Sequence, residues 1–589
     1  RQPLYDALLP NRNFTKDQEF REQLSVDWFI CDGLRLKGQM AIVKGETSGE
    51  IYKSPFSAEF LKTTYNSESR VQEYLPIAER GYLSMTDGAS FSYDGNVTLN
   101  YNTLVNEKHI IYAGAGLEVT QNDNNSHGFI MTGFPDDRYS DPAFAIQYKK
   151  ETKPSSSESK SRAIGFFANG NYSYDDRYFA DVSVRIDGSS KFGADKKYAP
   201  FWSAGAGWNV HNEKFFKHTK ISMLKLRYSY GVTGNQEFSA YQAKTMFQFN
   251  TDRLYNSGIS AALMGYGNPD LEWQNQYQSN YGFDFGYAKD RIRLQFNYYQ
   301  KKTEGMLTSV SVAPSLGLPS NTFTSNLGKI QNKGVEVNLN AVLIRDQGKD
   351  FEWSVMLQAA HNKNKIMEIS TALKNINEKN NQDKTTPAAV YEEGESMSAI
   401  KAVPSLGIDP TTGQELFMKK DGTITYTWDA TDKVICGDSE PKVFGNVGTN
   451  LYWKGWNLNM VFKYDLGADY YNSTLAERVE GANPRYNADR RVLNNRWKEP
   501  GQHALYKNIK EYTTTYISSR FVQKENTLQL TSLSLSYDLN REWIRKFGLN
   551  TMRLSFYMND VFRASTVKNE RGLDYPFQRS FVFGLNIGF

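Results

Sequence analysis

Apolar and polar residues alternate with a period of two along most of the chain. The runs Ala180–Ile186, Arg291–Tyr298 and Leu528–Tyr537 largely follow this pattern, with apolar or aromatic side chains separated by polar or small ones. The alternation is typical of β-strands with one apolar and one polar face. Several runs extend over about 11 to 14 residues, beyond the ~5–6 usual in soluble strands and sufficient for the ~9–11 of a membrane-spanning strand. The pattern predicts an all-β fold, a transmembrane antiparallel β-barrel.

Runs of this kind predict about 17 strands, whose type is more secure than their ends. They fall near 23–32, 34–44, 93–104, 108–120, 161–174, 176–188, 200–211, 222–233, 276–288, 291–303, 333–345, 351–363, 444–454, 456–467, 525–538, 551–561 and 579–589. We interpret residues 1–589 as one partial barrel domain.

The predicted connections alternate between tight turns and long polar segments. The tight turns are rich in Asp, Asn and Gly, which suit short hairpins, and fall at 31–33, 106–108, 174–176, 289–290, 348–350 and 454–455. The long segments fall at 45–80, 121–160, 234–275, 304–332, 364–443 and 468–524. Short periplasmic turns and long extracellular loops are typical of a barrel in a Gram-negative outer membrane. A soluble sandwich has no reason to sort its connections in this way.

The C-terminal strand carries apolar residues at successive odd positions. They are Phe581, Phe583, Leu585, Ile587 and Phe589. A last strand with an apolar outer face and a terminal aromatic matches the signal that outer-membrane assembly machinery recognises. On a soluble protein the same terminus would be an aggregation hazard. We therefore interpret these five residues as an assembly signal.

Composition narrows the alternatives. The 69 basic and 65 acidic residues leave a formal charge of +4, without the basic stripe of a nucleic-acid binder, so no nucleic-acid partner is expected. No run approaches the ~18 consecutive apolar residues of a transmembrane helix. The six histidines have no close pair, which argues against zinc. The cysteines Cys31 and Cys436 form either a disulfide or two unpaired thiols; we favour unpaired thiols, because their separation in space does not follow from sequence.

Acidic turns raise the question of calcium. The segments 409–413, 420–422 and 122–125 carry Asp, Asn and Gly, and their oxygens could hold a calcium ion. They lack the spacing of an EF-hand loop, so we interpret them as Asx-type turns. No cofactor or metal ligand is predicted.

Sequence blocks spread over the whole chain resemble the SusC/RagA group of TonB-dependent transporters. Each block is modest alone, but their number, order and spacing make the resemblance specific. The blocks are 187–193 (DGSSKFG), 204–208 (AGAGW), 213–215 (EKF), 226–236 (LRYSYGVTGNQ), 268–273 (NPDLEW), 298–303 (YYQKKT), 332–336 (NKGVE), 407–413 (GIDPTTG), 559–562 (NDVF) and 575–581 (YPFQRSF).

The resemblance implies a 22-stranded barrel filled by an N-terminal plug. Because single-chain bacterial barrels have even strand numbers, we expect about five more strands and the plug upstream, in this polypeptide or a separate one. The family further implies import driven by TonB acting on the plug, a SusD-like surface lipoprotein as a lid, contact with outer-membrane lipid, and a dimer of barrel–lid pairs. The implied cargo is a bulky nutrient, an oligosaccharide or an oligopeptide.

Candidate cargo contacts are aromatic residues of the long segments: Tyr266, Trp273, Trp428 and Tyr471. Such side chains stack on sugars or pack against peptides, but more often they anchor a loop to its neighbour. Two other functions remain open. A passive porin would usually be complete in one chain with shorter loops. An outer-membrane enzyme would need a convergent catalytic constellation, and the histidines, at 109, 127, 211, 218, 361 and 503, suggest none, so we do not expect an enzyme.

Overall fold

The structure is a computed structural model. It describes residues 5–60, 63–66, 71–193, 196–216, 220–235, 241, 243–255, 258–268, 271–311, 322–326, 328–369, 374, 377–378, 380–385, 387–483, 488–511, 513–568 and 579–588.

One antiparallel sheet forms the wall of the molecule. It has 18 strands, of which β7 (Gln147–Tyr148) only adds a two-residue pairing beside β6. The other strands pair in chain order. They are β1 (Arg12–Cys31), β2 (Leu34–Lys53), β5 (Tyr82–Val105), β6 (His109–Thr132), β8 (Ser155–Tyr174), β9 (Tyr178–Ser189), β10 (Tyr198–Asn209), β11 (Ile221–Asn235), β14 (Gln274–Tyr287), β15 (Ile292–Glu304), β18 (Lys329–Asp346), β19 (Phe351–Glu368), β25 (Val443–Trp453), β26 (Trp456–Tyr471), β27 (Val522–Asp538), β28 (Thr551–Ser565) and β29 (Phe581–Gly588).

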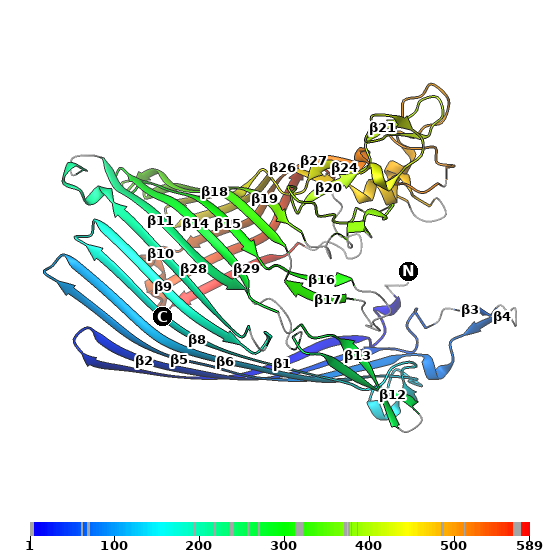
Figure 1. Ribbon diagram of the computed structural model, residues 1–589, viewed down its shortest axis with the longest axis horizontal. Coiled ribbons are helices and arrows are strands. Elements are labelled where there is room, and N and C mark those ends of the chain that lie inside the picture. Colours follow the sequence, from blue (N-terminus) through cyan, green and yellow to red (C-terminus); the bar gives the residue numbers. More distant parts are fainter. Residues whose placement is uncertain are drawn as a thin grey trace.

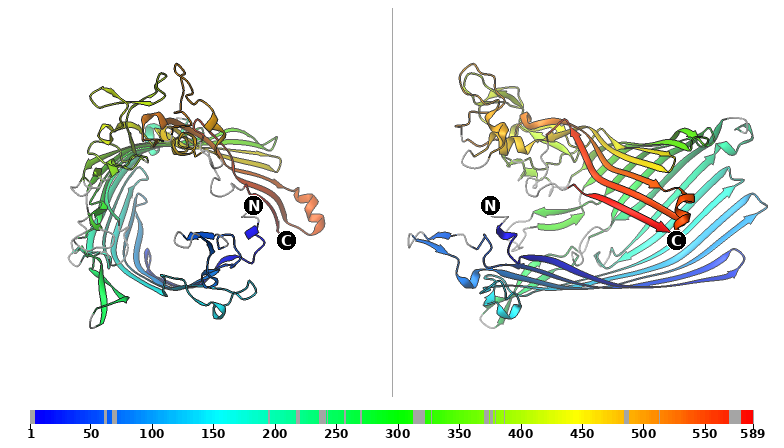
Figure 2. Two further views of the ribbon diagram at one scale, coloured as in Figure 1. Left: turned by 90° about the vertical axis from the view of Figure 1, so that its right-hand side faces the viewer. Right: turned by 180° about the vertical axis from the view of Figure 1, so that it is seen from behind.

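The wall is a single tilted layer that curves around a central axis (Figure 1). Figure 2, left, shows it running most of the way round a circle, with the first strands in blue at one edge and the last strands in red at the other. Within the described residues, β1 pairs only with β2, and β29 pairs only with β28. The sheet therefore has two unpaired edges and the curvature of a large barrel.

Register places the apolar residues of neighbouring strands on one face. Leu533 lies opposite Met460 of β26 and Met558 of β28, whereas Ser534 lies between Asn459 and Tyr557. Towards the loops, the register shifts between Leu530 and Ser532 in both pairings, and this irregularity brings Leu530 back to the apolar face although its parity differs from that of Leu533. The wall thus has an apolar outer face and a polar inner face, the arrangement that lipid and a wet lumen require.

The tight turns have the backbone conformation that two-residue hairpins need. At the β5–β6 turn, Asn106 and Glu107 have φ values of 51° and 57°, and at the β8–β9 turn Asp175 and Asp176 have 53° and 51°. Two successive left-handed residues define a type I′ turn, whose twist matches that of paired strands. The predicted tight turns are confirmed, and they lie together at one end of the barrel.

The opposite end carries the long connections and their small sheets. The paired strands there are β3 (Thr63–Asn66) with β4 (Val71–Tyr74), β12 (Met246–Tyr255) with β13 (Gly258–Gly265), β16 (Leu307–Ser311) with β17 (Thr322–Asn326), β20 (Ala399–Ala402) with β24 (Val434–Asp438), and β21 (Ser405–Ile408) with β22 (Glu415–Met418) and β23 (Ile424–Thr425).

Helices are short throughout the described residues. They are η1 (Ile77–Glu79), η2 (Pro142–Phe144), η3 (Val210–Asn212), η4 (Lys214–Phe216), η6 (Ala430–Asp432), η7 (Thr474–Glu480), η8 (Arg490–Leu493), η9 (Ser519–Phe521), α3 (Arg541–Ile544) and η10 (Arg545–Phe547). None of them is both long enough and apolar enough to pass through a bilayer.

All of the predicted strands are present, but several loop boundaries were wrong. The segment 45–80 begins as strand up to Lys53, and the segment 121–160 is strand up to Thr132 and again from Ser155. These extensions lack the apolar alternation because they rise beyond the lipid. The last predicted position, Phe589, lies outside the described residues, as does His218.

Candidate functional site: the loop assembly at the barrel mouth

The two longest connections pack against each other at the loop end of the barrel. One joins β19 to β25 and carries β20–β24; the other joins β26 to β27 and carries η7–η9. The backbone N–H of Ser519 donates to the Val403 carbonyl at 2.9 Å, and Trp497 Nε1 donates to the Pro410 carbonyl at 2.9 Å. Figure 1 shows β20, β21 and β24 gathered beyond the ends of the wall strands. We call this unit, residues 387–442 with 472–483, 488–511 and 513–521, the loop assembly.

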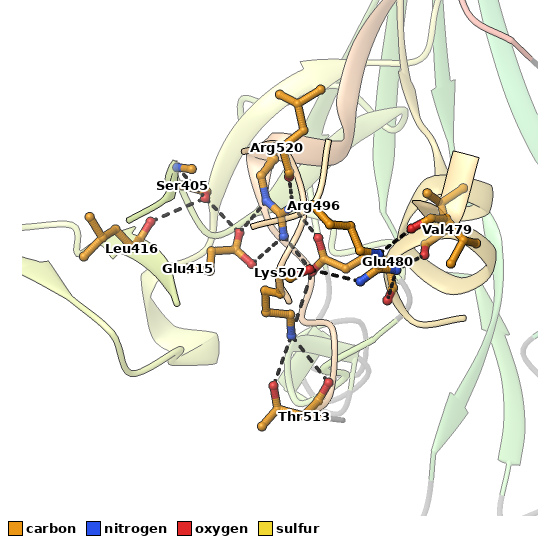
Figure 3. Close-up of polar contacts among 12 residues, drawn as sticks. Ser405, Glu415, Leu416, Val479, Glu480, Arg496, Lys507, Thr513 and Arg520 are labelled. Carbon is orange, nitrogen blue, oxygen red and sulfur yellow. Dashed lines mark hydrogen bonds and ion pairs between the residues drawn. The ribbon is translucent and has the colours of Figure 1, made fainter. Parts of the chain in front are cut away.

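A buried ion cluster joins the two halves of the loop assembly (Figure 3). Arg520 Nη2 donates to Glu415 Oε2 at 2.8 Å, and Arg520 Nη1 donates to Glu480 Oε2 at 2.5 Å. The three side chains are 11%, 5% and 1% exposed. Burial alone would lower the pKa of Arg520, but its hydrogen bonds to Glu480 and the charge of Glu415 outweigh burial and raise it. One guanidinium thus neutralises carboxylates from both loops.

Two further cations, Arg496 and Lys507, complete the cluster beside η7. Arg496 is buried and donates to the carbonyls of Val479 and Glu480, the latter at 2.9 Å. Lys507 Nζ lies 3.8 Å from Glu480 Oε1 and donates to Thr513 Oγ1 at 3.2 Å. Because buried charges are costly unless they are paired and hydrogen-bonded, these contacts fix the path of the second loop.

A polar cavity of about 440 Å³ adjoins the ion cluster. It is lined by Glu480, Gly481, Ala482, Asn483, Ile509, Glu511 and Thr513. Carboxylates, amides and hydroxyls accept hydrogen bonds from hydroxyl or amine groups. Chemically, the cavity suits part of a polyhydroxylated or amine-bearing ligand.

The inner wall carries arginine side chains that reach across a whole strand. Arg185 of β9 donates to Glu118 of β6 at 2.7 Å, passing over β8 at Gly165. Arg227 of β11 lies over Gly282 of β14 and donates to Asn297 of β15 at 3.0 Å as well as to Asp284 at 2.8 Å. A side chain at either glycine would collide with the guanidinium. The lumen is therefore lined by charged groups that compensate one another.

Two predicted cargo aromatics hold the loop assembly together: Trp428 lies within it, and Tyr471 lies at its edge as the last residue of β26. Trp428 stacks on Tyr516 with ring centroids 5.1 Å apart and donates through Nε1 to the Ile517 carbonyl at 2.9 Å. Tyr471 packs edge-on against Phe521, with centroids 6.1 Å apart. Its hydroxyl is buried without a hydrogen-bond partner among the described residues.

The other two predicted aromatics lie in a different loop, between β11 and β14. Trp273 is 6% exposed and stacks on Phe192 at 4.3 Å, in a cluster with Phe201 and Val232. Tyr266 is 44% exposed. The structure therefore does not bring the four residues into one site, and Tyr266 is the one whose side chain is exposed.

The acidic turns of the loop assembly are closed by their own hydrogen bonds. Asp409 accepts from the Thr411 N–H at 2.8 Å and from the Tyr426 hydroxyl at 2.5 Å, and Asp421 accepts from the Thr423 N–H at 2.8 Å. These are Asx turns, as expected, whereas Asn122–Asn125 lie within β6. Across the described ranges, no group of three or more His, Cys, Asp or Glu is arranged to hold a metal ion.

The cysteines lie at opposite ends of the barrel. Cys31 ends β1 at a tight turn, whereas Cys436 lies in β24 within the loop assembly. Both thiols are free. Burial raises the pKa of the Cys436 thiol, which donates to the Ala402 carbonyl at 3.4 Å.

Sequence reasoning missed the ion cluster. Glu415 precedes Arg520 by 105 residues and Glu480 precedes it by 40, and each lies in a polar segment where charges are expected to face water. No local motif marks such residues, because their partners are set by how two loops pack. A signal could come only from covariation between the loops.

A β-barrel of the outer membrane is defined by four features together: tight turns gathered at one end, an apolar outer face, a polar inner face and long strands. Residues 6–561 match the family described as TonB dependent receptor-like, beta-barrel. The chain belongs to this family.

Curated relatives agree with this assignment. TonB-dependent receptor P3 of Formosa agariphila is 28% identical over 486 residues, which are 74% of this chain and 46% of the relative. TonB-dependent receptor SusC of Bacteroides thetaiotaomicron is 23% identical over 535 residues, 85% of this chain and 51% of the relative. The chain thus spans about half the length of these relatives.

Solved structures show the same fold. The RagAB peptide transporter matches with a TM-score of 0.82 at 21% identity, over 96% of this chain and 60% of the compared chain. The RagAB peptide importer in its "closed-closed" state matches with a TM-score of 0.83, also at 21% identity, over 100% of this chain and 63% of the other. The resemblance to the SusC/RagA group that the sequence blocks predicted is confirmed.

Proposed function

We propose that the chain is the barrel wall of an energised importer of bulky nutrients. The observation that carries the proposal is the match of residues 6–561 to the TonB-dependent barrel family. Within the described residues β1 and β29 each have one unpaired edge, which supports the further proposal that more strands complete the wall, because an open sheet edge is not tolerated in lipid. About five further strands and a plug, supplied by this polypeptide or another, would close the wall and fill the lumen.

The proposed cargo is an oligosaccharide or an oligopeptide. The compared RagAB structures are those of a peptide transporter, whereas the polar cavity beside Glu480 and Glu511 suits hydroxyls as well as amines. Tyr266 is the foremost proposed contact because its ring is exposed. Trp273, Trp428 and Tyr471 would act mainly by holding the loops that face the cargo.

The proposed partners follow from the same likeness. The loop assembly would meet a SusD-like surface lipoprotein that closes over the mouth, and the plug would transmit force from TonB. The inner-wall cations Arg185 and Arg227 would contact the plug. Two barrel–lid pairs would form a dimer. Each of these roles concerns the complete receptor.

Uptake by cells that carry the complete receptor tests the proposal. Labelled oligosaccharides and oligopeptides of graded length are supplied with and without an uncoupler that collapses the proton gradient. An importer accumulates its cargo and stops when the gradient is lost. Passage that continues at the same rate with the uncoupler would establish a passive porin instead.

A matched pair of variants tests the cargo contact. Tyr266→Ala should raise the concentration for half-maximal uptake several-fold, since an exposed aromatic contact contributes about 1 kcal/mol. Tyr139→Ala is the control, because Tyr139 is similarly exposed at 43% but lies in the β6–β8 loop. Equal effects in the two variants would remove Tyr266 from the cargo site.

A further inference from the structure

The outer face of the barrel carries a basic cavity at the level where lipid head groups lie. The cavity has a volume of about 560 Å³ and lies over β5, β6, β8, β9 and β10. Tyr93 and Arg162 both face outwards beside Gln121, and Val119 lies opposite Ile164 on the same face. The cavity therefore opens away from the lumen.

Height along the strand places the cavity at the outer leaflet. Val119 is ten residues (119 − 109) beyond His109, where β6 leaves the tight turn. At about 3.3 Å per residue and a tilt of about 40°, this distance is roughly 25 Å, the height of the apolar band of such barrels. Val119 thus marks the outer boundary of the hydrocarbon, with Arg162 above it.

Three cations surround the upper part of the cavity. They are Arg162, Lys197 and Lys244, and no Asp or Glu is among the described residues that line it. The backbone N–H of Lys160 donates to the Tyr241 hydroxyl at 3.0 Å, which holds the segment bearing Lys244 beside the wall. The nearby carboxylate of Asp123 is already paired with the Lys160 ammonium at 2.8 Å. The cavity therefore has an uncompensated positive charge.

Arg162 is held so that most of its donors remain available. Its Nε donates to Oε1 of the buried Gln121 at 2.7 Å, which fixes the plane of the guanidinium. Within the described residues no ion pair of Arg162, Lys197 or Lys244 occurs. A fixed guanidinium with free N–H groups and two ammonium groups is the donor set that binds phosphate.

An apolar groove continues from the cavity into the membrane. Its volume is about 360 Å³, and it shares Val119 with the basic cavity. The groove is lined by Leu24, Val26, Gly38, Gln39, Met40, Gly95, Asn96, Val97, Leu117 and Val119. A Cβ added at Gly38 would meet nothing within 4 Å, and one at Gly95 would meet only the Val119 carbonyl at 4.0 Å. Because glycine has no side chain, these two positions leave a depression in the lipid-facing wall.

We propose that the cavity and the groove form one binding site for a phosphorylated lipid of the outer leaflet. Its phosphate would lie among Arg162, Lys197 and Lys244, and one of its acyl chains would fill the groove over Gly38 and Gly95. The positive charge of the cavity favours an anionic head, and the shared lining residue Val119 lets one molecule place its head in the cavity and a chain in the groove. The site is independent of the cargo and of its transport.

Native mass spectrometry of the complete receptor, extracted in mild detergent and stripped of lipid, tests the proposal. The receptor is titrated with a monophosphorylated acylated glucosamine lipid, with its dephosphorylated counterpart, and with inorganic phosphate. We expect the phosphorylated lipid to bind at least ten-fold more tightly than either. Equal binding of the two lipids would overturn the proposal, as would inorganic phosphate binding as tightly as the phosphorylated lipid.

Variants of the head cavity assign the binding to these residues. The triple variant Arg162→Ala, Lys197→Ala, Lys244→Ala should lower the affinity for the phosphorylated lipid about five-fold for each cation removed, since each contributes about 1 kcal/mol at a membrane surface. The control is Lys333→Ala with Lys363→Ala, two exposed lysines that lie opposite each other on the outer face of β18 and β19. If variant and control lost the same affinity for the lipid, binding would reflect general attraction of the anionic lipid to basic residues of the wall, and the proposed site would be wrong.

Filling the groove tests the acyl chain separately. Gly38→Leu with Gly95→Leu should lower the affinity for the lipid about four-fold for each acyl methylene that no longer fits in the groove, at about 0.8 kcal/mol per CH₂. The barrel should remain folded. Gly170→Leu is the control, because Gly170 faces lipid opposite Val182, outside the groove. Unchanged binding in the double variant would overturn the assignment of the groove.

Discussion

A single guanidinium, that of Arg520, joins the two loops over the barrel mouth. Removing it would leave Glu415 and Glu480 buried without their main cation, and breaking a buried pair in this way costs about 3–5 kcal/mol. We expect Arg520→Met to open the loop assembly of the complete receptor, measured as faster hydrogen exchange in 472–483 and 513–521. Arg138→Met should have almost no effect, because the Arg138 side chain is 76% exposed in its pair with Asp136. Similar exchange in both variants would show that the cluster does not hold the loops.

Asp409 gives the Asx turn a pH dependence. The Tyr426 hydroxyl and the Thr411 N–H hold the pKa of Asp409 below its usual range. A carboxyl with a lowered folded pKa contributes stability that is full above its unfolded pKa and is lost as the pH falls through the folded value. The amide of Thr411 should therefore stay protected at neutral pH and lose protection only in strong acid. In Asp409→Asn its protection should be weaker and pH-independent; an unchanged profile would contradict this account.

At the scale of elements, the alternation of residues found every wall strand but not every strand end. Lipid forces one face of a strand to be apolar, so the spanning part has a readable period. Beyond the lipid, β6 continues through Asn122–Ser126 with polar residues on both faces, and β-pairing there leaves no periodic trace. The turns were predictable because Asp, Asn and Gly tolerate positive φ.

The loop assembly could not be predicted in the same way. Trp428 and Tyr516 stack although 88 residues separate them (516 − 428), and no local period relates such partners. Charged loop residues usually face water, so Arg520, Glu415 and Glu480 looked ordinary in the sequence. Packing between distant segments determines this site, and composition does not encode it.

The two faces of β27 should respond differently to a charge. Leu533 is five residues (538 − 533) from the tight-turn end of the strand at Asp538, roughly 13 Å up an apolar band about 25 Å tall. Leu533→Arg should therefore destabilise the folded barrel by about 2–4 kcal/mol. Ser534→Arg, one position along and facing the lumen, should cost less than about 1 kcal/mol. The heat needed to unfold the complete receptor on SDS gels measures both, and equal shifts would contradict the assigned faces.

Gly165 permits the ion pair that crosses β8. A Cβ there would collide with Arg185 and lie 2.6 Å from Asp187 Oδ1, so Gly165→Val should displace the guanidinium from Glu118. The pair is partly exposed, at 38% and 34%, so the expected loss is at most about 1 kcal/mol. Gly170→Val on the outer face of the same strand meets its nearest atom at an ordinary 3.7 Å and should be neutral. The same gel measurement compares the stability of the two variants. A greater loss of stability for Gly170→Val than for Gly165→Val would contradict the assigned role of Gly165.

At the scale of the whole molecule, the wall needs partners at both edges. β1 and β29 each pair on one side within the described residues, and unpaired backbone groups in hydrocarbon cost several kcal/mol each. A barrel therefore becomes stable only when its last strand is recruited and sealed. We therefore expect β29 to have a role in assembly beyond its share of the wall.

The predicted assembly signal can be tested by comparing the outward-facing and inward-facing residues of β29. Phe583 and Leu585 are 79% and 57% exposed and lie opposite Phe556 and Leu554 on the lipid side. Phe583→Ser with Leu585→Ser in the complete receptor should sharply lower the amount of folded barrel in outer membranes, because each change removes about 1.5–3 kcal/mol of apolar burial as well as the signal. Val582→Ser is the control, since Val582 is 54% exposed but faces the lumen, and its level should stay near normal. If the control fell as far as the double variant, assembly would depend on the strand as a whole, and the apolar row would lose its separate role.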